Sequence, residues 1–243
     1  ADRSGNGFFV PAEALEKILF REDCEEFFEM LAHASTAEEK GMLEYRVNIA
    51  DFGERPVYAW HRTIYKSVPG ENGKILRILG RTEDITREKH LQDEIEQRLK
   101  QDDLTGLLNK STTKSEIEGF LKDNIRGSHA LFLIDVDNFK TINDTLGHMF
   151  GDSVLINVAK KIQEQFRATD VVGRIGGDEF MVFMKYTDFY QAKQKAERIC
   201  NSTKQIYHGR DGEEVQVRCS VGVALYGAIK ESYSSLFSKA DMA

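Results

Sequence analysis

The seven residues Arg174–Phe180 constrain this chain more than any other stretch, because two acids follow two glycines between apolar runs. The valines Val171–Val172 come before the stretch, and the apolar run Phe180–Met184 continues from its end. Short β-branched and aromatic runs on both sides of a glycine turn are typical of a β-hairpin. We therefore expect a hairpin that carries Asp178 and Glu179 at its tip.

The two glycines of this turn, Gly176 and Gly177, suit a site that holds a phosphate. Glycine adopts positive φ without strain, and it has no Cβ to keep a phosphate away. Asp178 and Glu179 would repel that phosphate unless a divalent cation lay between them. Considered alone, these residues fit a metal-nucleotide turn and an ordinary β-turn about equally well.

The composition fits a two-domain protein with no general surface for nucleic acid. The chain has 243 residues, and its hydrophobic content of 41% is enough to build real cores. A formal net charge of -7 argues against a nucleic-acid polymer or an anionic membrane as the partner. No apolar run approaches the ~20 residues that span a bilayer. Three widely spaced cysteines, without a Cys-x-x-Cys pair, indicate reduced thiols in a cytoplasmic protein.

The N-terminal third has the pattern of two helices followed by an antiparallel meander. Helical spacing predicts helices over Pro11–Phe20 and Arg21–Leu31. Alternating apolar residues predict three strands, separated by turn residues at Asp51–Gly53 and Pro69–Gly73. The predicted strands are Leu43–Ile49, Val57–Tyr65 and Ile75–Thr82.

This order of elements resembles the PAS family of sensory domains. The resemblance is carried by Glu44–Arg46, by the segment Asp51–Trp60 and by the closing run Gly80–Thr86. It implies an incomplete PAS-like sensor domain over residues 1–86 that regulates the C-terminal part of the chain.

Residues 87–101 predict a charged connector helix with a narrow apolar stripe. Leu91, Ile95 and Leu99 recur every four residues, and acids precede bases at the spacing that stabilises an isolated helix. A solvated spacer would explain the charges. A stripe on a charged helix more often packs against a second helix, and a parallel coiled coil is the economical partner.

From Asp102 the sequence acquires specific motifs. The run Asp102–Lys110 opens a new domain, and an apolar strand over His129–Ile134 leads into Asp135 and Asp137. The run Asp135–Asp152 follows directly. Together with the hairpin, these motifs are similar to those of the GGDEF family of diguanylate cyclases, with Lys110 where the family usually has arginine.

The resemblance implies a site for GTP and a metal ion. It implies that Asp135, the Val136 carbonyl and Asp178 hold Mg²⁺ or Mn²⁺. Their oxygen atoms are the ligands that such hard cations prefer. It assigns Asp178, Glu179 and Lys140 to catalysis. The substrate-binding residues that it implies are Asn143 and Asp152, which read guanine, and His148, Gly176 and Gly177, which lie near the nucleotide.

A second motif precedes the hairpin. By its composition Arg167–Asp170 needs to be no more than a surface salt bridge. Its offset from the glycines matches the family's inhibitory site, in which Arg167 and Asp170 bind cyclic di-GMP and Arg198 assists. Feedback inhibition by the product is therefore implied.

The segments that follow the hairpin are predicted to form a helix and two strands that support the domain. Residues Asp188–Thr203 predict a helix. Turn residues at Arg210–Gly212 join two strands, and Val215, Cys219 and Val223 alternate with polar residues along the second, so Cys219 is expected in the core.

These observations predict an α+β protein with three parts: a PAS-like antiparallel sheet (residues 1–86), a connector helix (87–101) and a nucleotide-cyclase-like domain (102–243) with a mixed central sheet flanked by helices. The implied reaction joins two GTP into cyclic di-GMP and two pyrophosphates. One turn holds one nucleotide, so a homodimer is required, and a sensor that changes dimer geometry sets the rate. The alternative is an inactive cyclic-di-GMP receptor or adaptor. Intact Asp135, Asp178 and Glu179 favour the enzyme.

Overall fold

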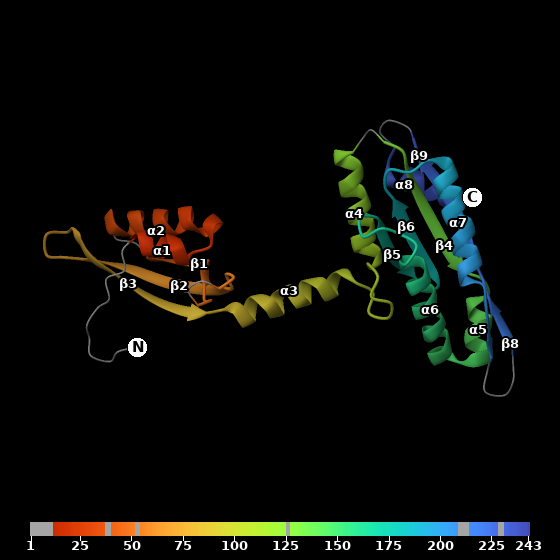
Figure 1. Cartoon of the computed structure of the whole chain (residues 1–243), viewed down its shortest axis with the longest axis horizontal. Coiled ribbons are helices and arrows are strands. Elements are labelled where there is room, and N and C mark those ends of the chain that lie inside the picture. The colour runs from red at the N-terminus through yellow and green to blue at the C-terminus, as the bar shows by residue number, and fades with distance from the viewer. Residues whose placement is uncertain (1–11, 37–39, 52–53, 125–126, 209–213, 228–230) are drawn as a thin grey trace. The chain divides into compact units, whose positions relative to one another are not determined.

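The chain forms two compact units, which divide between Ile95 and Glu96. The computed structural model in Figure 1 describes residues 12–36, 40–51, 54–124, 127–208, 214–227 and 231–243. Several residues of the expected helix start and turns lie outside these ranges: Pro11, Phe52, Gly53 and the run Arg210–Gly212.

The first unit is a three-stranded antiparallel sheet with helices on one face, as the sequence predicts. The strands pair in the order β1-β2-β3. Each strand extends past its predicted bounds at one end, whereas β1 ends and β2 starts just inside them. The second predicted helix divides into a short 3-10 turn and α2. The elements are α1 (Ala12–Ile18), η1 (Arg21–Asp23), α2 (Cys24–Thr36), β1 (Lys40–Asn48), β2 (Tyr58–Pro69) and β3 (Ile75–Asp84).

An arginine on β1 ties the helical layer to this sheet. The guanidinium of Arg46 donates to both carboxylate oxygens of Asp23, at 2.9 and 2.6 Å, and lies 3.7 Å from the centre of the Phe20 ring. The hydrogen bonds from Arg46 hold the pKa of Asp23 below its ordinary value, although burial opposes them. The core beneath consists of Leu19, Phe27, Leu43 and Tyr45.

The connector helix α3 (Thr86–Lys100) starts where β3 ends. Its first residue is hydrogen-bonded to β2, because the Thr86 hydroxyl accepts from the Trp60 amide at 2.8 Å. The predicted stripe is open to solvent: Leu91, Ile95 and Leu99 are 49%, 58% and 71% exposed. The pairing with a second helix stays a prediction.

The second unit is an α+β sandwich around a four-stranded sheet of order β5-β6-β4-β9. Its three strand pairings are antiparallel, and a single parallel bridge joins Leu108 to Gly173 at the outer edge of β5. The mixed character expected of this sheet comes from that bridge. The elements are α4 (Lys110–Asp123), β4 (His129–Val136), α5 (Phe139–Leu146), α6 (His148–Gln163), β5 (Val171–Gly176), β6 (Glu179–Met184), α7 (Phe189–Thr203), β7 (Gln205–His208), β8 (Glu214–Val217), β9 (Cys219–Tyr226) and α8 (Tyr233–Asp241).

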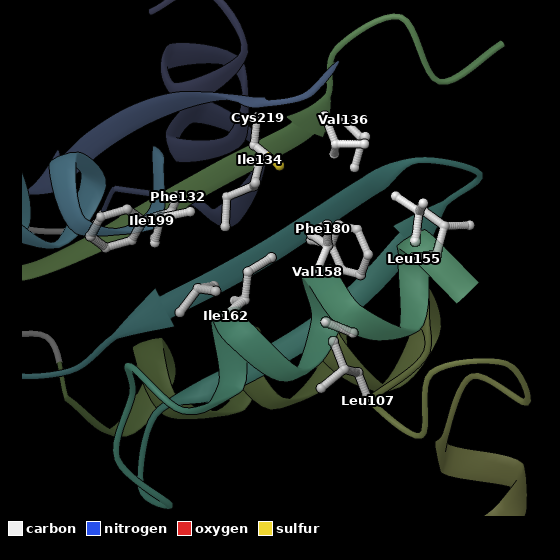
Figure 2. Close-up of a cluster of buried hydrophobic side chains, with 14 of the residues drawn as sticks. Leu107, Phe132, Ile134, Val136, Leu155, Val158, Ile162, Phe180, Ile199 and Cys219 are labelled. Atoms are coloured by element: carbon white, nitrogen blue, oxygen red, sulfur yellow. The ribbon is translucent and has the colours of Figure 1, made fainter. Parts of the chain in front are cut away.

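Helices cover both faces of this sheet, and each strand alternates its side chains between the two layers. On one face, side chains from α6 and α7 pack against Phe132, Ile134 and Phe180 (Figure 2). On the other face, α4 and α8 pack against Leu131 and Met181. The central strand β4 is therefore covered on both sides, which explains its continuous apolar run.

One expectation about the C-terminal strands is wrong. The alternation from Val215 to Val223 predicts one strand, but Arg218 divides it into β8 and β9. β8 pairs with β7 in a separate two-stranded sheet, whereas β9 pairs with β4 in the central sheet. The alternation continues through the break, so periodicity alone cannot detect it. Cys219 is buried in the core, as expected.

A close backbone approach fixes the start of this unit to the sheet. The Leu108 amide donates to the Val172 carbonyl at 3.3 Å, and the Arg174 amide donates to the Leu108 carbonyl at 2.8 Å. Gly173 lies between them, and a Cβ built on it would lie 2.8 Å from the Leu108 carbonyl oxygen and would overlap the Thr113 hydroxyl. A side chain at Gly173 would push the two segments apart.

We therefore expect Gly173→Ala to destabilise the second unit by about 1–3 kcal/mol, the usual effect of overfilling a packed site. Thermal or urea unfolding followed by circular dichroism measures the loss. The matched control is Gly119→Ala within α4, where a Cβ meets nothing within 4 Å. This control should gain up to about 1 kcal/mol from helix propensity. Equal stability of the two variants would contradict the prediction.

Candidate active site

The predicted metal ligands come together where β4 ends beside the β5–β6 turn. Asp135 lies opposite Glu179 in the register of β4 and β6, so their side chains share one face of the sheet. The Val136 amide donates to the Asp178 carbonyl at 3.2 Å, which holds the turn against the end of β4. The hairpin therefore has the acids at its tip, as predicted.

The two glycines of the turn act through the space they leave rather than through their backbone angles. Neither Gly176 nor Gly177 has positive φ, which differs from what their residue type suggests. A Cβ on Gly177 would meet no atom within 4 Å, and one on Gly176 would lie 3.1 Å from the Glu179 carboxylate. The turn is open on its outer side, where a phosphate could approach the backbone.

The charges at this site fit a cation. Partial burial raises the pKa of Asp135 above its ordinary value, and the nearby Asp178, Glu179 and Asp137 raise it further. A bound divalent cation would remove this repulsion. Among the described residues no three His, Cys, Asp or Glu side chains form a complete metal cage. Two carboxylates and one carbonyl still fit Mg²⁺, which usually takes its other oxygens from water and substrate phosphates.

A cavity of about 630 Å³ lies beside these acids. Asp135, Glu179 and Ser220 line it together with the C-terminal end of α8. This volume lies within the range of small-molecule sites. The Ser220 hydroxyl donates to the Asp137 carboxylate at 2.7 Å, so Asp137 is held to β9. A nucleotide phosphate would have room here next to the metal ligands.

The predicted substrate-binding residues lie on the helix pair α5–α6, which follows β4 directly. Asn138 makes the sharp turn out of β4, with a left-handed backbone at φ 55° that asparagine tolerates. Asn143 is half-buried on α5. The other three predicted residues, Lys140, His148 and Asp152, are exposed, and their side chains make no hydrogen bond or ion pair with any described residue. They are therefore free to meet a ligand.

The residues predicted for the inhibitory site come from the loop between α6 and β5 and from α7. The Asp170 carboxylate accepts from the Arg167 amide and from the Lys185 amide, both at 3.0 Å, so its position is fixed. Burial lowers the pKa of Lys195, as do the charges of Arg198 and Arg167, while Asp170 raises it. These four side chains are therefore close together, and sequence reasoning missed Lys195. Arg198 and Lys195 also line a groove of about 590 Å³ between α6 and α7.

An arginine on β5 holds the turn to the start of the domain. Arg174 donates to the Gly177 carbonyl from Nε at 3.0 Å and from Nη2 at 2.6 Å. Its Nη1 donates to Asp102 at 3.0 Å. The amide and hydroxyl of Thr105 also donate to this Asp102 oxygen, at 2.9 and 2.7 Å. The sequence signal for this link is weak: a lone arginine in an apolar strand, far from its acid in the chain.

Comparison with known proteins agrees with this geometry. The family model of the diguanylate cyclase GGDEF domain matches residues 99–243, more than half of the chain. The chain belongs to the GGDEF family. The match covers the second unit and does not extend over the N-terminal unit, so the likeness of its three-stranded sheet to PAS domains remains a resemblance.

Individual relatives of this GGDEF domain come from several bacteria. Diguanylate cyclase TpbB of Pseudomonas aeruginosa is 37% identical over 145 residues, which are 58% of this chain and 33% of the relative. Diguanylate cyclase A of Treponema denticola is 41% identical over 114 residues, 47% of this chain and 31% of the relative. The chain thus matches about a third of the length of these relatives.

A solved structure has the same arrangement. The GGDEF domain of DgcB from Caulobacter crescentus, crystallised in complex with c-di-GMP, aligns with a TM-score of 0.56 at 27% identity. The alignment covers 59% of this chain and 86% of that domain. In the described parts of this chain, no helix is long and apolar enough to cross a membrane.

Because Arg174 is bonded to Asp102, we expect that replacing Arg174 lowers the stability of the fold by an amount that depends on pH. Burial acts to raise the pKa of Asp102, but hydrogen bonds from Thr105 and Arg174 outweigh it and hold the pKa below its ordinary value. A lowered carboxyl pKa stabilises the fold above the unfolded value of about 3.9 and stops doing so as the pH falls through the folded value.

Arg174→Gln should therefore lower the free energy of unfolding by about 1.5–3 kcal/mol at neutral pH, the range for hydrogen bonds to charged groups. The difference from wild type should shrink as the pH falls below about 3.9, where Asp102 of the unfolded chain becomes protonated, and should level off only below the lower pKa of the folded state. Urea unfolding at pH 7 and near pH 3 measures both values. Hydrogen exchange should also be faster at residues 176–179. A loss that is the same at both pH values would exclude the ion pair as its cause.

Proposed function

We propose that this GGDEF domain is a diguanylate cyclase that condenses two GTP molecules into cyclic di-GMP and two pyrophosphates. The observation that carries the proposal is the gathering of Asp135, Asp178 and Glu179 at the end of β4 and on an open turn, where Asp135 and Glu179 line a cavity. Repelling carboxylates at a nucleotide-sized cavity serve a metal-dependent phosphoryl transfer. The matched family and its cyclase relatives support the same reaction.

The metal site would consist of Asp135, the Val136 carbonyl and Asp178, with Glu179 beside them. When bound there, Mg²⁺ or Mn²⁺ neutralises phosphate charge and lowers the pKa of a nearby hydroxyl. Asp178 accepts the proton of the attacking 3'-hydroxyl. The 3'-oxygen then forms a bond to the α-phosphorus of the partner GTP, and the bond to the leaving pyrophosphate breaks. Lys140 stabilises the charge on the α-phosphate.

The guanine base would be read from the α5–α6 helix pair. The Asp152 carboxylate accepts from the guanine N1 and N2 hydrogens, and the Asn143 amide can both donate and accept. His148 lies at the start of the same helix as Asp152, near the nucleotide. Because adenine lacks both donors, we expect GTP to be strongly preferred over ATP.

The reaction needs two copies of the domain, because each turn holds one GTP and each 3'-hydroxyl attacks the other nucleotide. The exposed stripe on α3 supplies a surface for a homodimer, since Leu91, Ile95 and Leu99 lie open on a charged helix. The N-terminal unit, PAS-like in the order of its elements, would act as a sensor that sets the dimer geometry.

The product would inhibit the enzyme at Arg167, Asp170 and Arg198. Arginine pairs with phosphate and stacks on purines, and the fixed Asp170 carboxylate accepts from guanine. The structure of DgcB with c-di-GMP supports binding of this ligand by the fold. A non-enzymatic cyclic-di-GMP receptor would use the same three residues. The charge cluster around Asp135 favours the enzyme, because a receptor gains nothing from mutually repelling acids.

Asp178→Asn should abolish product formation and leave the fold intact, because the turn is exposed and little packing depends on it. The measurement is chromatographic identification of products after incubation of the purified chain with GTP and Mg²⁺, beside a melting curve for each protein. Lys193→Ala, an exposed substitution on the outer side of α7, is the control and should keep wild-type turnover. Full turnover by Asp178→Asn would remove Asp178 from the reaction.

Arg167→Ala should weaken cyclic di-GMP binding by about 1.5–3 kcal/mol, the usual contribution of a charge-assisted hydrogen bond. The initial rate with GTP should stay unchanged, because Arg167 lies outside the metal site, while inhibition by added product should be relieved. Titration calorimetry and initial rates with and without product test both parts. Unchanged product affinity would contradict the inhibitory role.

A further inference from the structure

Gly151 occupies a place where glycine is unfavourable on local grounds. It lies within α6, in the first turn and a half of the helix, and it is buried. A glycine inside a helix costs about 1 kcal/mol relative to alanine. Its amide makes an ordinary helical hydrogen bond to the Gly147 carbonyl at 3.1 Å, and its φ is not positive. The backbone therefore does not require glycine here.

The lack of space around Gly151 explains why this helical position is occupied by a glycine. A Cβ built on Gly151 would overlap the carboxamide oxygen of Asn143 and would lie 3.0 Å from Asn143 Cγ. It would also lie 3.2 Å from Cζ of Phe139. The Asn143 amide thus lies directly on the bare backbone of α6. Gly119, in the middle of α4, has open space around the same position, so this requirement is not shared by every helical glycine of the domain.

We propose that Gly151 is a positioning residue for purine recognition: its missing Cβ seats the Asn143 carboxamide against α6, next to Asp152. This inference rests on the proposed function, in which Asn143 and Asp152 read guanine. The methyl group of an alanine at this position would displace the Asn143 carboxamide from its contact with α6. Displacements of about 1 Å at a recognition site reduce function by up to about a hundredfold.

Three features of the site make the position of the Asn143 carboxamide depend on Gly151. The Asn143 side chain makes no hydrogen bond with any described residue, so no polar partner holds it in place and the contact with α6 must do so. Asp152 follows Gly151 directly in the chain, so the seat and the carboxylate share one helical turn. An amide and a carboxylate must present their atoms to one base edge together, because a mismatch leaves a polar group unpaired.

The first experiment compares nucleotide binding by the wild-type chain and Gly151→Ala, using calorimetry with non-hydrolysable analogues of GTP and ATP in Mg²⁺. We expect the GTP analogue to bind about tenfold or more weakly to Gly151→Ala, and the preference for GTP over ATP to fall with it. The control is Gly119→Ala, which should keep both affinities. A purely structural role for Gly151 would lower the melting temperature without changing the GTP-to-ATP ratio.

The second experiment repeats the substitution in an Asn143→Ala background. Because the displaced carboxamide is then absent, Gly151→Ala should cause little further loss of GTP affinity, and the two changes should be strongly non-additive. If Gly151→Ala fails to fold, the same double variant decides: it should fold and match Asn143→Ala in its GTP-to-ATP ratio. A double variant that also fails to fold, or additive losses, would overturn the proposal.

The outcomes separate this inference from the proposed function. If the wild-type chain binds both analogues equally, the guanine assignment fails and the role of Gly151 fails with it. If wild type prefers the GTP analogue and Gly151→Ala keeps that preference, the proposed function stands and only the positioning role is overturned.

Discussion

The second unit depends on one arginine that holds a turn of like charges in place. Asp178 and Glu179 lie close to Asp135, and their repulsion acts to open the β5–β6 turn. Arg174 opposes this by donating two hydrogen bonds to the Gly177 carbonyl and one to Asp102. Its side chain is 13% exposed and its bond to Asp102 is partly buried, so solvent weakens that bond little, whereas the two bonds to Gly177 are open to solvent. The turn therefore keeps its like-charged acids close together, and the proposed cation would meet its ligands already in position.

The register of β4 against β6 places Asp135 and Glu179 on the same face of the sheet. Side chains alternate between the two faces of a sheet, so a slip of one residue would move Asp135 to the opposite face from Glu179. The apolar alternation that fills both layers fixes that register: Ile134 and Phe180 pair and face α6, while their neighbours Asp135 and Glu179 pair on the other side. Core packing thus decides where the acids point, and substitutions far from the turn can still alter the site.

Local features of the site could be predicted from the sequence, and long-range ones could not. The hairpin follows from the apolar runs beside Gly176 and Gly177, and the helix from Asp188 follows from its capping side chain, which accepts from the Gln191 amide. By contrast, the bond from Arg174 to Asp102 joins residues 72 positions apart, and no local pattern encodes it. Lys195 lies one helical turn before Arg198 on α7, but only the fold brings both close to Arg167 and Asp170. The break at Arg218 escaped prediction because the strands on both sides keep the same alternation, although they belong to different sheets.

Helix α3 has hydrogen bonds at both ends that tie it to two different sheets. At its start, the Thr86 hydroxyl accepts from β2, and Lys89 and Glu88 extend the attachment through ion pairs with Glu44 and Arg62. At its end, the Asn109 side chain donates to the Leu99 carbonyl at 2.7 Å while it caps α4. Leu108, the neighbour of Asn109, hydrogen-bonds to β5, which leads to Arg174 and the β5–β6 turn. A rotation of α3 would therefore reach the turn through the Asn109 side chain, the backbone hydrogen bonds between Leu108 and β5, and the Arg174 side chain. These contacts would let the proposed sensor influence the proposed catalytic turn without touching the nucleotide.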